Sequence, residues 1–251
     1  MKFRRRTVYQ ALFVVVWPCI ALAAPASTLN VDDVIAKYID ALGGRSKLDG
    51  VKSIKLTAKV SFPGGIEAAG TAEVMRPNKV RTDVTMQGRT DTEAYDGISG
   101  WALRGTAGRT EPEKLPKEDL AEIEARLRIE SPLIDYRKKG FTAALAGTED
   151  IEGAKAYKIK LSKADGSTEL HYLDAEKFLP LKIRCKWPFQ GGHREYEQSF
   201  SDYRAIDGLI LAHWIQGRDG GGNIDFTASI EKVQINASIA EERFAMPKAQ
   251  N

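Results

Sequence analysis

The sequence predicts a mainly β (α+β) protein in which a curved antiparallel sheet forms an incomplete barrel, plugged by an N-terminal helix and a mid-chain helical insertion. About twelve segments alternate apolar and polar residues, a pattern typical of strands with one dry and one wet face. Their connections are too short for βαβ crossovers and often contain Asp-Gly, as at 96–97 and 207–208, which favours antiparallel hairpins. Two segments, 31–42 and 115–129, instead repeat apolar residues at helical spacing.

The N-terminus has the pattern of a secretory signal peptide, which we place at residues 1–26. Four basic residues precede the apolar stretch ALFVVVWPCIALA (11–23), and small residues follow at cleavage spacing. A membrane anchor is the alternative, but a span needs about 20 apolar residues and this stretch is shorter and contains Pro18. A lipid-modified Cys19 is a third possibility, although the bulky Trp17 and Pro18 stand where such signals carry small residues.

Removal of this segment changes the charge balance of the protein. Four of the 37 basic residues and none of the 34 acidic residues lie within residues 1–23, so the net charge falls from +3 to −1. A basic surface for nucleic acid or acidic membranes is therefore not predicted. Cys185 remains as the only cysteine, so no intrachain disulfide can form and the fold must rest on its core. Residues 27–251 contain no linker or repeat, and we expect one domain.

The first predicted helix begins at Asn30, a favourable N-cap, and ends at Gly43-Gly44. Its apolar residues recur on one face, so the helix must lie against another element. The strands follow with clear alternation in SIKLTAKVSF (53–62), KVRTDVTM (79–86), AYKIKL (156–161) and LPLKIRCKW (179–187). Two more segments, LILAHWI (209–215) and IDFTASIEKVQI (224–235), are interpreted as further strands.

The second helix interrupts the strands after about five of them and precedes about seven more. It begins near Pro116 and carries a narrow apolar stripe of Leu120, Ile123 and Leu127. A long antiparallel sheet with one apolar face must curl over something, and the two helices can cover its inner face. Such an arrangement can leave an apolar cavity between sheet and helices.

An ordered series of landmarks resembles a known family. It includes ALGG at the end of the first helix, RPNKVRTDVTMQG, AYDGISGW, the long segment from DYRKKGF to FLPLKI, EQSFSDYRAIDGLILAHWI and FAMP. These are similar to the outer-membrane lipoprotein-sorting proteins with the LolA/LolB-type fold, over nearly the whole chain after the signal. The landmarks are turns and strands and include no catalytic signature.

The resemblance implies an unclosed barrel plugged by helices that binds lipoprotein acyl chains or other lipids without covalent chemistry. It implies a periplasmic carrier that is not an enzyme, needs no cofactor and acts as a monomer, with an envelope membrane protein as a candidate partner. The alternative is an RseB-like sensor of envelope lipids or a protein-interaction module. A carrier should pass its lipid to an acceptor, whereas a sensor should hold a protein partner whose affinity changes with lipid.

The stretch HYLDAEKFLPLKI (171–183) gathers residue types that can catalyse reactions or bind metals. We interpret it as a strand, a turn at DAEKF and a second strand beginning at Pro180. Asp174 and Glu176 are then turn residues, and Cys185 could join His171 only through tertiary proximity. The three histidines lie on separate strands without ligand spacing, so no metal site is predicted.

Two further motifs lack the context that their chemistry needs. No serine lies in a Gly-x-Ser-x-Gly elbow, which excludes a hydrolase signature of that kind. The glycines of GRDGGGNID (217–225) precede a strand, whereas a phosphate-binding loop precedes a helix.

Apolar and aromatic residues on the strands are the candidates for lining a lipid cavity, with ordinary core packing as the alternative for each. Arg81 lies on the face opposite Val80 and Val84, and is either exposed or a polar anchor at the cavity mouth. The candidates are Leu56, Val60, Phe62, Arg81, Trp101, Tyr157, Trp187, Trp214 and Phe226.

We expect export with cleavage after Ala23 or Ala26, because the basic start and short apolar run match a cleavable signal. N-terminal sequencing of the protein recovered from its native host tests this. A cytoplasmic chain that keeps Met1 would contradict this prediction. Lipid on Cys19 would show that the protein is a lipoprotein and is not cleaved after Ala23 or Ala26.

Overall fold

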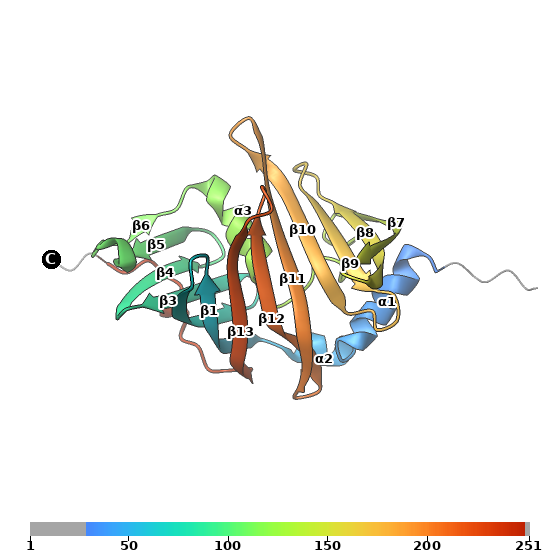
Figure 1. The fold of residues 1–251 in the computed structure, drawn as a ribbon, viewed down its shortest axis with the longest axis horizontal. Helices are drawn as coiled ribbons and strands as arrows, with labels where there is room; N and C mark the ends of the chain where they lie inside the picture. Colours follow the sequence, from blue (N-terminus) through green and yellow to red (C-terminus); the bar gives the residue numbers. More distant parts are fainter. Residues whose placement is uncertain (1–28, 249–251) are drawn as a thin grey trace, which may run out of the picture.

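The computed structural model describes residues 29–248, which form one antiparallel sheet of 13 strands with three α-helices (Figure 1). The predicted signal peptide, its cleavage points and Cys19 lie outside these residues. The incomplete antiparallel barrel expected from the sequence is confirmed. The structure has 13 strands where the sequence predicts about twelve. The strand that the sequence does not reveal is β6, whose two residues are too few to show alternation.

The elements are distributed as the sequence predicts, with strands on both sides of a helical insertion. The strands are β1 (Ser53–Phe62), β2 (Ile66–Met75), β3 (Lys79–Met86), β4 (Arg89–Tyr95), β5 (Gly100–Arg104), β6 (Glu113–Lys114), β7 (Thr142–Ile151), β8 (Ala154–Ser162), β9 (Thr168–Asp174), β10 (Pro180–Phe189), β11 (Gly192–Ile206), β12 (Leu209–Asp219) and β13 (Ile224–Ile235). The helices are α1 (Val31–Ala41), α2 (Arg45–Gly50) and α3 (Lys117–Arg126).

One strand pair joins two meanders into a single sheet. Strands β1 to β6 pair in sequence order, as do β7 to β13, and β1 pairs with β13. Ala58 lies opposite Ile230, and Val60 opposite Ala228, with a register shift beside Ala58. The strands β6 and β7 therefore form the two outer edges of the sheet. Residues 115–141, which connect them, must cross from one edge to the other.

Helix α1 confirms the helix that the sequence predicts at this position. The Asn30 side chain accepts hydrogen bonds from the backbone N–H groups of Asp32 and Asp33, and the Asp33 carboxylate accepts from the Asn30 N–H. At the other end Gly43 has φ +117°, and a Cβ there would lie 2.3 Å from the Gly208 carbonyl oxygen. Glycine is required here because the chain passes the β11–β12 turn at close range.

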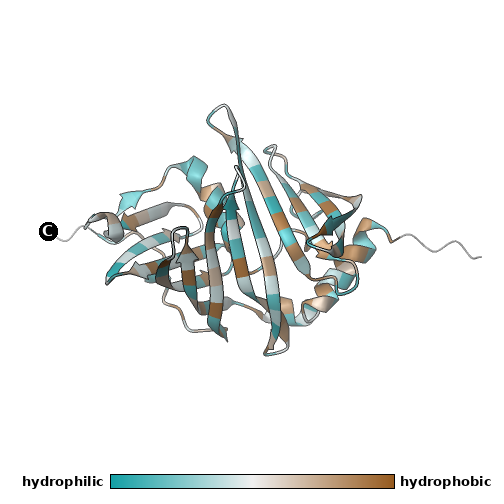
Figure 2. Cartoon of the chain, viewed as in Figure 1, coloured by the Kyte–Doolittle hydropathy of each residue, from teal (hydrophilic) through white to brown (hydrophobic). Residues whose placement is uncertain are grey.

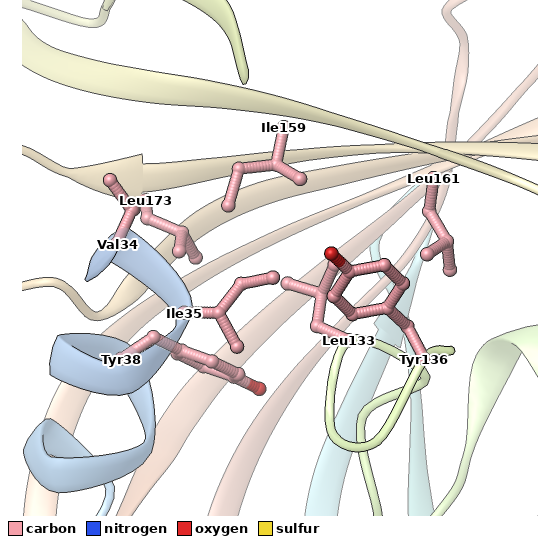
Figure 3. Packing of buried hydrophobic residues seen from close by; sticks show 8 residues of the cluster. All are labelled: Val34, Ile35, Tyr38, Leu133, Tyr136, Ile159, Leu161 and Leu173. Carbon is pink, nitrogen blue, oxygen red and sulfur yellow. The ribbon is translucent and has the colours of Figure 1, made fainter. Parts of the chain in front are cut away.

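The largest apolar cluster lies where α1 and the crossing segment cover one end of the sheet. Figure 3 shows the side chains that α1, the crossing segment, β8 and β9 contribute to it: Val34, Ile35, Tyr38, Leu133, Tyr136, Ile159, Leu161 and Leu173. Leu133, Ile159 and Leu173 have no exposed surface. The inner face of β7–β9 is therefore filled by the protein itself.

Helix α3 lies over the other part of the inner face. It begins after Pro116, as the sequence predicts, but it ends at Arg126, three residues before the expected end, and Leu127 is already extended. Leu120 and Ile123 pack with Val80 and the neighbouring apolar residues of β2–β4. Gly100 on β5 makes room for this contact, because a Cβ there would lie 2.4 Å from a methyl carbon of Leu120.

A buried ionic cluster fixes the crossing segment to β9. Glu169 accepts two hydrogen bonds from the Arg128 guanidinium at 2.7 and 3.1 Å, and its carboxylate lies 3.0 Å from Lys163 Nζ and 3.1 Å from His171 Nε2. Burial favours the neutral acid, but the charge of Arg128 and the hydrogen bond with His171 outweigh burial and hold the pKa of Glu169 well below its usual range. Burial lowers the pKa of His171, although Glu169 opposes this effect.

We expect Glu169→Gln to lower the free energy of unfolding by about 3 kcal/mol at neutral pH, because the change leaves Arg128 and Lys163 without their buried counter-charge. The folded-state pKa of Glu169 lies below the unfolded value of about 4.3, so the ionised carboxylate stabilises the fold above that pH. This contribution is lost as the pH falls through the folded-state pKa. Urea unfolding across a pH series should show the two proteins converging under acid conditions.

The exposed Glu176→Gln on the following turn is the matched control and should match the parent protein throughout. A constant difference between Glu169→Gln and the parent across the acid range would contradict the electrostatic explanation.

Candidate functional site

An apolar cavity of about 440 Å³ lies on the inner face of β1–β4 and β11–β13, beneath α3. This volume falls within the range of about 300–1,000 Å³ that is usual for small-molecule sites. Its apolar wall consists of Leu56, Ala58, Val60, Phe62, Gly70, Ala72, Val80, Val84, Met86, Ile123, Leu127, Ile215, Phe226, Ala228 and Ile230. Figure 2 shows the alternation of apolar and polar residues along the strands from which this wall is built.

Small residues keep the middle of the cavity open. Ala58, Gly70, Ala72 and Ala228 lie on the inner faces of three adjacent strands, β13, β1 and β2. A Cβ on Gly70 would approach a methyl carbon of Val60 to 2.8 Å, so glycine is needed for the packing of this wall. The volume that larger side chains would occupy is left free, in contrast to the filled end of the sheet beneath α1.

One end of the cavity is polar and charged. Asp91, Glu93 and Arg104 project from β4 and β5, Asp225 from β13 and Arg126 from the end of α3. Arg104 donates to Glu93 at 2.7 Å, and the Arg126 guanidinium lies 3.7 Å from Glu93 and 3.8 Å from Asp225. Arg126 also forms an ion pair with Glu122 one turn earlier on α3. The cavity is therefore amphipathic along its length.

Polar contacts to β11 hold α3 across the cavity. Arg194 donates to Glu122 at 2.8 Å and to Asp119 at 3.3 Å. The Gln198 amide donates to the Arg126 carbonyl oxygen at 3.2 Å. Together with Ile123 and Leu120 on the opposite side, these contacts make α3 a bridge between the β2–β5 wall and the β10–β11 wall.

Four of the residues singled out in the sequence line this cavity. Leu56, Val60 and Phe62 follow one another on β1, and Phe226 lies on the neighbouring β13. Their contact with a lipid stays a prediction. Sequence reasoning did not single out Val84 and Met86, although their alternation with Arg81 and Asp83 already placed them on the same face as Val80.

Arg81, Trp101 and Trp214 lie outside the cavity lining, because they alternate with residues that line it and so point to the other face. Trp101 is buried there by the C-terminal segment: its indole N–H donates to the Phe244 carbonyl oxygen at 2.9 Å. Arg81 lies over the Trp101 ring and donates to the Arg243 carbonyl oxygen at 2.9 Å. Their burial is thus structural and comes from a long-range contact that strand periodicity does not reveal.

Tyr157 and Trp187 are on the inner face but also outside the lining. Tyr157 stacks on Phe178 at a centroid distance of 5.7 Å and packs beside the α1 cluster at the other end of the sheet. Trp187 is buried with Cys185 and Tyr196 beneath Ala121 and Ala125 of α3. Helix α3 therefore separates Trp187 from the open part of the cavity.

The residues of the 171–183 stretch adopt the hairpin that the sequence predicts. The Asp174 carboxylate accepts hydrogen bonds from the backbone N–H groups of Glu176 and Lys177 at 2.9 and 2.7 Å. Burial raises the pKa of the Cys185 thiol to about 12, so it is not a ready nucleophile. The partner that sequence reasoning missed is Glu169, which carries the contact to His171.

Neither a metal centre nor a membrane-spanning helix is found between residues 29 and 248. In that range no three His, Cys, Asp or Glu side chains are grouped so that they could hold a metal ion. None of the helices there is both long and apolar enough to cross a bilayer.

Comparisons with known proteins identify the fold through structure alone. The sequence matches no family model and no curated protein. Among solved structures, a domain described as an outer-membrane lipoprotein-sorting protein from Vibrio parahaemolyticus superposes with a TM-score of 0.58 at 10% identity, covering 84% of this chain and 94% of its own. This chain has a LolA-like fold.

Two further structures support the same fold. A LolA superfamily protein from Nitrosomonas europaea gives a TM-score of 0.53 at 13% identity, with 87% of this chain and 98% of that chain covered. A DUF1329 family protein from Desulfovibrio piger gives 0.53 at 11% identity, with the same coverage of 87% and 98%. The LolA-like architecture thus extends over most of the chain, although sequence identity to these structures is low.

Proposed function

We propose that the protein is a periplasmic carrier that binds acyl chains of lipoproteins or other lipids in the cavity beneath α3. The observation that carries this proposal is an open apolar cavity of about 440 Å³ in a LolA-like fold whose other half is filled by its own helix. The names of the similar structures, one of them a lipoprotein-sorting domain, support the same function. The signal-like N-terminus supports export, and we propose residues 27–251 as one carrier domain.

Hydrocarbon burial alone can supply the affinity for such a ligand. Each methylene group transferred from water to an apolar site contributes about 0.8 kcal/mol. The wall from Leu56 to Phe62 and the facing Val84 and Met86 offer such a site without a charged contact. Because β1, β2 and β13 form this wall before the ligand binds, ordering the protein offsets little of the free energy gained by burying hydrocarbon.

Binding without covalent chemistry fits the charged groups of the cavity. Asp91 accepts hydrogen bonds from the backbone N–H and hydroxyl of Thr106 at 2.8 and 2.7 Å, and Glu93 is paired with Arg104. These carboxylates are held by neighbours and are not poised as a general acid and base. We therefore propose a carrier that is not an enzyme and needs no cofactor, and we propose separately that it acts as a monomer.

Two variants test whether the cavity binds an apolar ligand. Leu56→Glu places a charge in the apolar wall, and Val84→Trp fills space that a ligand would occupy. We expect the protein without its signal to bind the neutral fluorophore N-phenylnaphthylamine and release it when lipid competes. Each variant should weaken binding at least about tenfold, which corresponds to the loss of about two buried methylene groups. Fluorescence titration measures the dissociation constants.

The control is Ile98→Glu, which adds the same charge at a turn where the side chain is 89% exposed, and it should bind like the parent protein. Far-UV circular dichroism must show the same folded spectrum for each variant that is scored. Well-folded parent protein that binds neither fluorophore nor lipid would reject the carrier and favour a module that binds proteins.

A further inference from the structure

Three buried hydrogen-bond donors beside the cavity have no partner within residues 29–248. They are the Arg126 Nε–H, the Trp187 Nε1–H and the Tyr196 hydroxyl. Trp187 and Tyr196 are each only 4% exposed. Unpaired buried polar atoms are rare in folded proteins because each one costs the free energy of its lost hydration. Three of them together call for a physical reason.

The three donors belong to one locality. Cys185 pairs with Tyr196 and Trp187 with Arg194 across the β10–β11 ladder, so Trp187 and Tyr196 are diagonal neighbours on the inner face. The Arg126 guanidinium carbon lies 5.3 Å from the centroid of the Tyr196 ring. Helix α3 covers this locality, and Arg126 itself lines the cavity.

Gly217 on β12 directs the Tyr196 hydroxyl toward the cavity wall. A Cβ on Gly217 would lie 2.3 Å from the Tyr196 hydroxyl oxygen and 2.6 Å from a ring carbon of Phe226. The hydroxyl and the Phe226 ring therefore share the space above this glycine, and Phe226 lines the cavity. Burial raises the pKa of Tyr196, so the hydroxyl stays protonated and can donate at neutral pH.

The charges around these donors disfavour an anion. Arg126 shares Glu122 with Arg194 and Glu93 with Arg104, and it lies 3.8 Å from Asp225. With Asp119 and Asp91, five carboxylates are thus grouped with three guanidinium groups. A ligand carboxylate or phosphate would meet this negative field at close range. An uncharged carbonyl oxygen, which has two lone pairs, would satisfy two of the donors without that repulsion.

We propose that two of these donors, the Arg126 Nε–H and the Tyr196 hydroxyl, called here the carbonyl site, bind the uncharged acyl carbonyl of an ester or amide whose chain fills the cavity, while Trp187 lies behind α3. The inference rests on the proposed function and adds a specificity to it. Esterified or amide-linked acyl chains are favoured over free fatty acids. The hydrocarbon supplies affinity, and the carbonyl site fixes which end of the ligand lies beneath α3.

The unpaired Tyr196 hydroxyl should also affect the stability of the protein without ligand. Tyr196→Phe removes a buried hydroxyl that has no partner while keeping the ring that packs on Phe226 and Arg126. The empty variant should unfold about 2–4 °C higher than the parent, because a desolvated polar group is lost at no cost in hydrogen bonds. A hydroxyl that supports the fold would instead lower the unfolding temperature when removed.

Ligands of one chain length test the specificity. Methyl dodecanoate, N-methyldodecanamide and dodecanoate are titrated into the protein loaded with N-phenylnaphthylamine, at neutral pH. We expect the ester or the amide, or both, to displace the fluorophore at concentrations at least about fivefold lower than dodecanoate, the equivalent of one hydrogen bond. The better of the two identifies the linkage that the natural ligand carries.

Tyr196→Phe then separates the carbonyl site from the cavity itself. It should weaken the ester and amide about fivefold and leave the affinity for N-phenylnaphthylamine unchanged. Tyr157→Phe is the matched control and should alter neither ligand affinity nor unfolding temperature. Failure of the fluorophore to bind the parent protein would reject the proposed function.

Normal fluorophore binding combined with either of two results would overturn the carbonyl site alone. One is a dodecanoate affinity equal to or above that of the ester and amide. The other is a Tyr196→Phe variant that binds all ligands like the parent, as expected if only water meets these donors.

Discussion

The pairing of β1 with β13 is the constraint on which the rest of the architecture depends. It joins the first and last strands at the middle of the sheet and leaves β6 and β7 as the edges. A right-handed twist carried through so many strands curls the sheet, and the chain between the edges has to cross the concave face. Helix α3 lies on that path, as Figure 1 shows, so the bridge over the cavity is a consequence of strand order.

The concave face is filled unevenly, and this difference creates the cavity. At the β7–β9 end, α1 and the segment around Leu133 bring large apolar side chains that close the space. At the β1–β3 end, alanines and Gly70 leave the space open, and only one face of α3 covers it. The ionic contacts of Glu169 with Arg128 and of Glu122 with Arg194 hold the crossing segment between these two environments. The same chain thus builds a filled end and an open end.

The polar groups of the open end fall into two kinds. Arg104, Glu93 and Asp91 satisfy one another or the backbone, so they define the rim without demanding a charged ligand. Trp187 and Tyr196 are buried without hydrogen-bond partners among the described residues, and an unpaired buried donor lowers the stability of the empty protein. Sites that bind ligands commonly sacrifice stability in this way, because a group satisfied by the protein is not available to a ligand.

Local patterns in the sequence were sufficient for the elements but not for all of the site. The cap at Asn30, Pro116 before α3 and the alternation around Leu56 and Val60 act over a few residues, and the structure confirms the elements they predict. Helix α2 went undetected because its six residues bury none of their side chains and show no periodic apolar face. Trp101 is apolar and on a strand, yet its burial depends on a segment that lies 143 residues further along the chain. Contacts of that kind follow from the topology and leave no periodic trace in the sequence.

Native mass spectrometry of the protein isolated gently from its own host tests the carrier proposal most directly. The proposal predicts a population heavier than the bare chain, and extraction of that population should release an acyl lipid. Folded protein that has only the mass of the bare chain, and from which no lipid can be extracted, would contradict it.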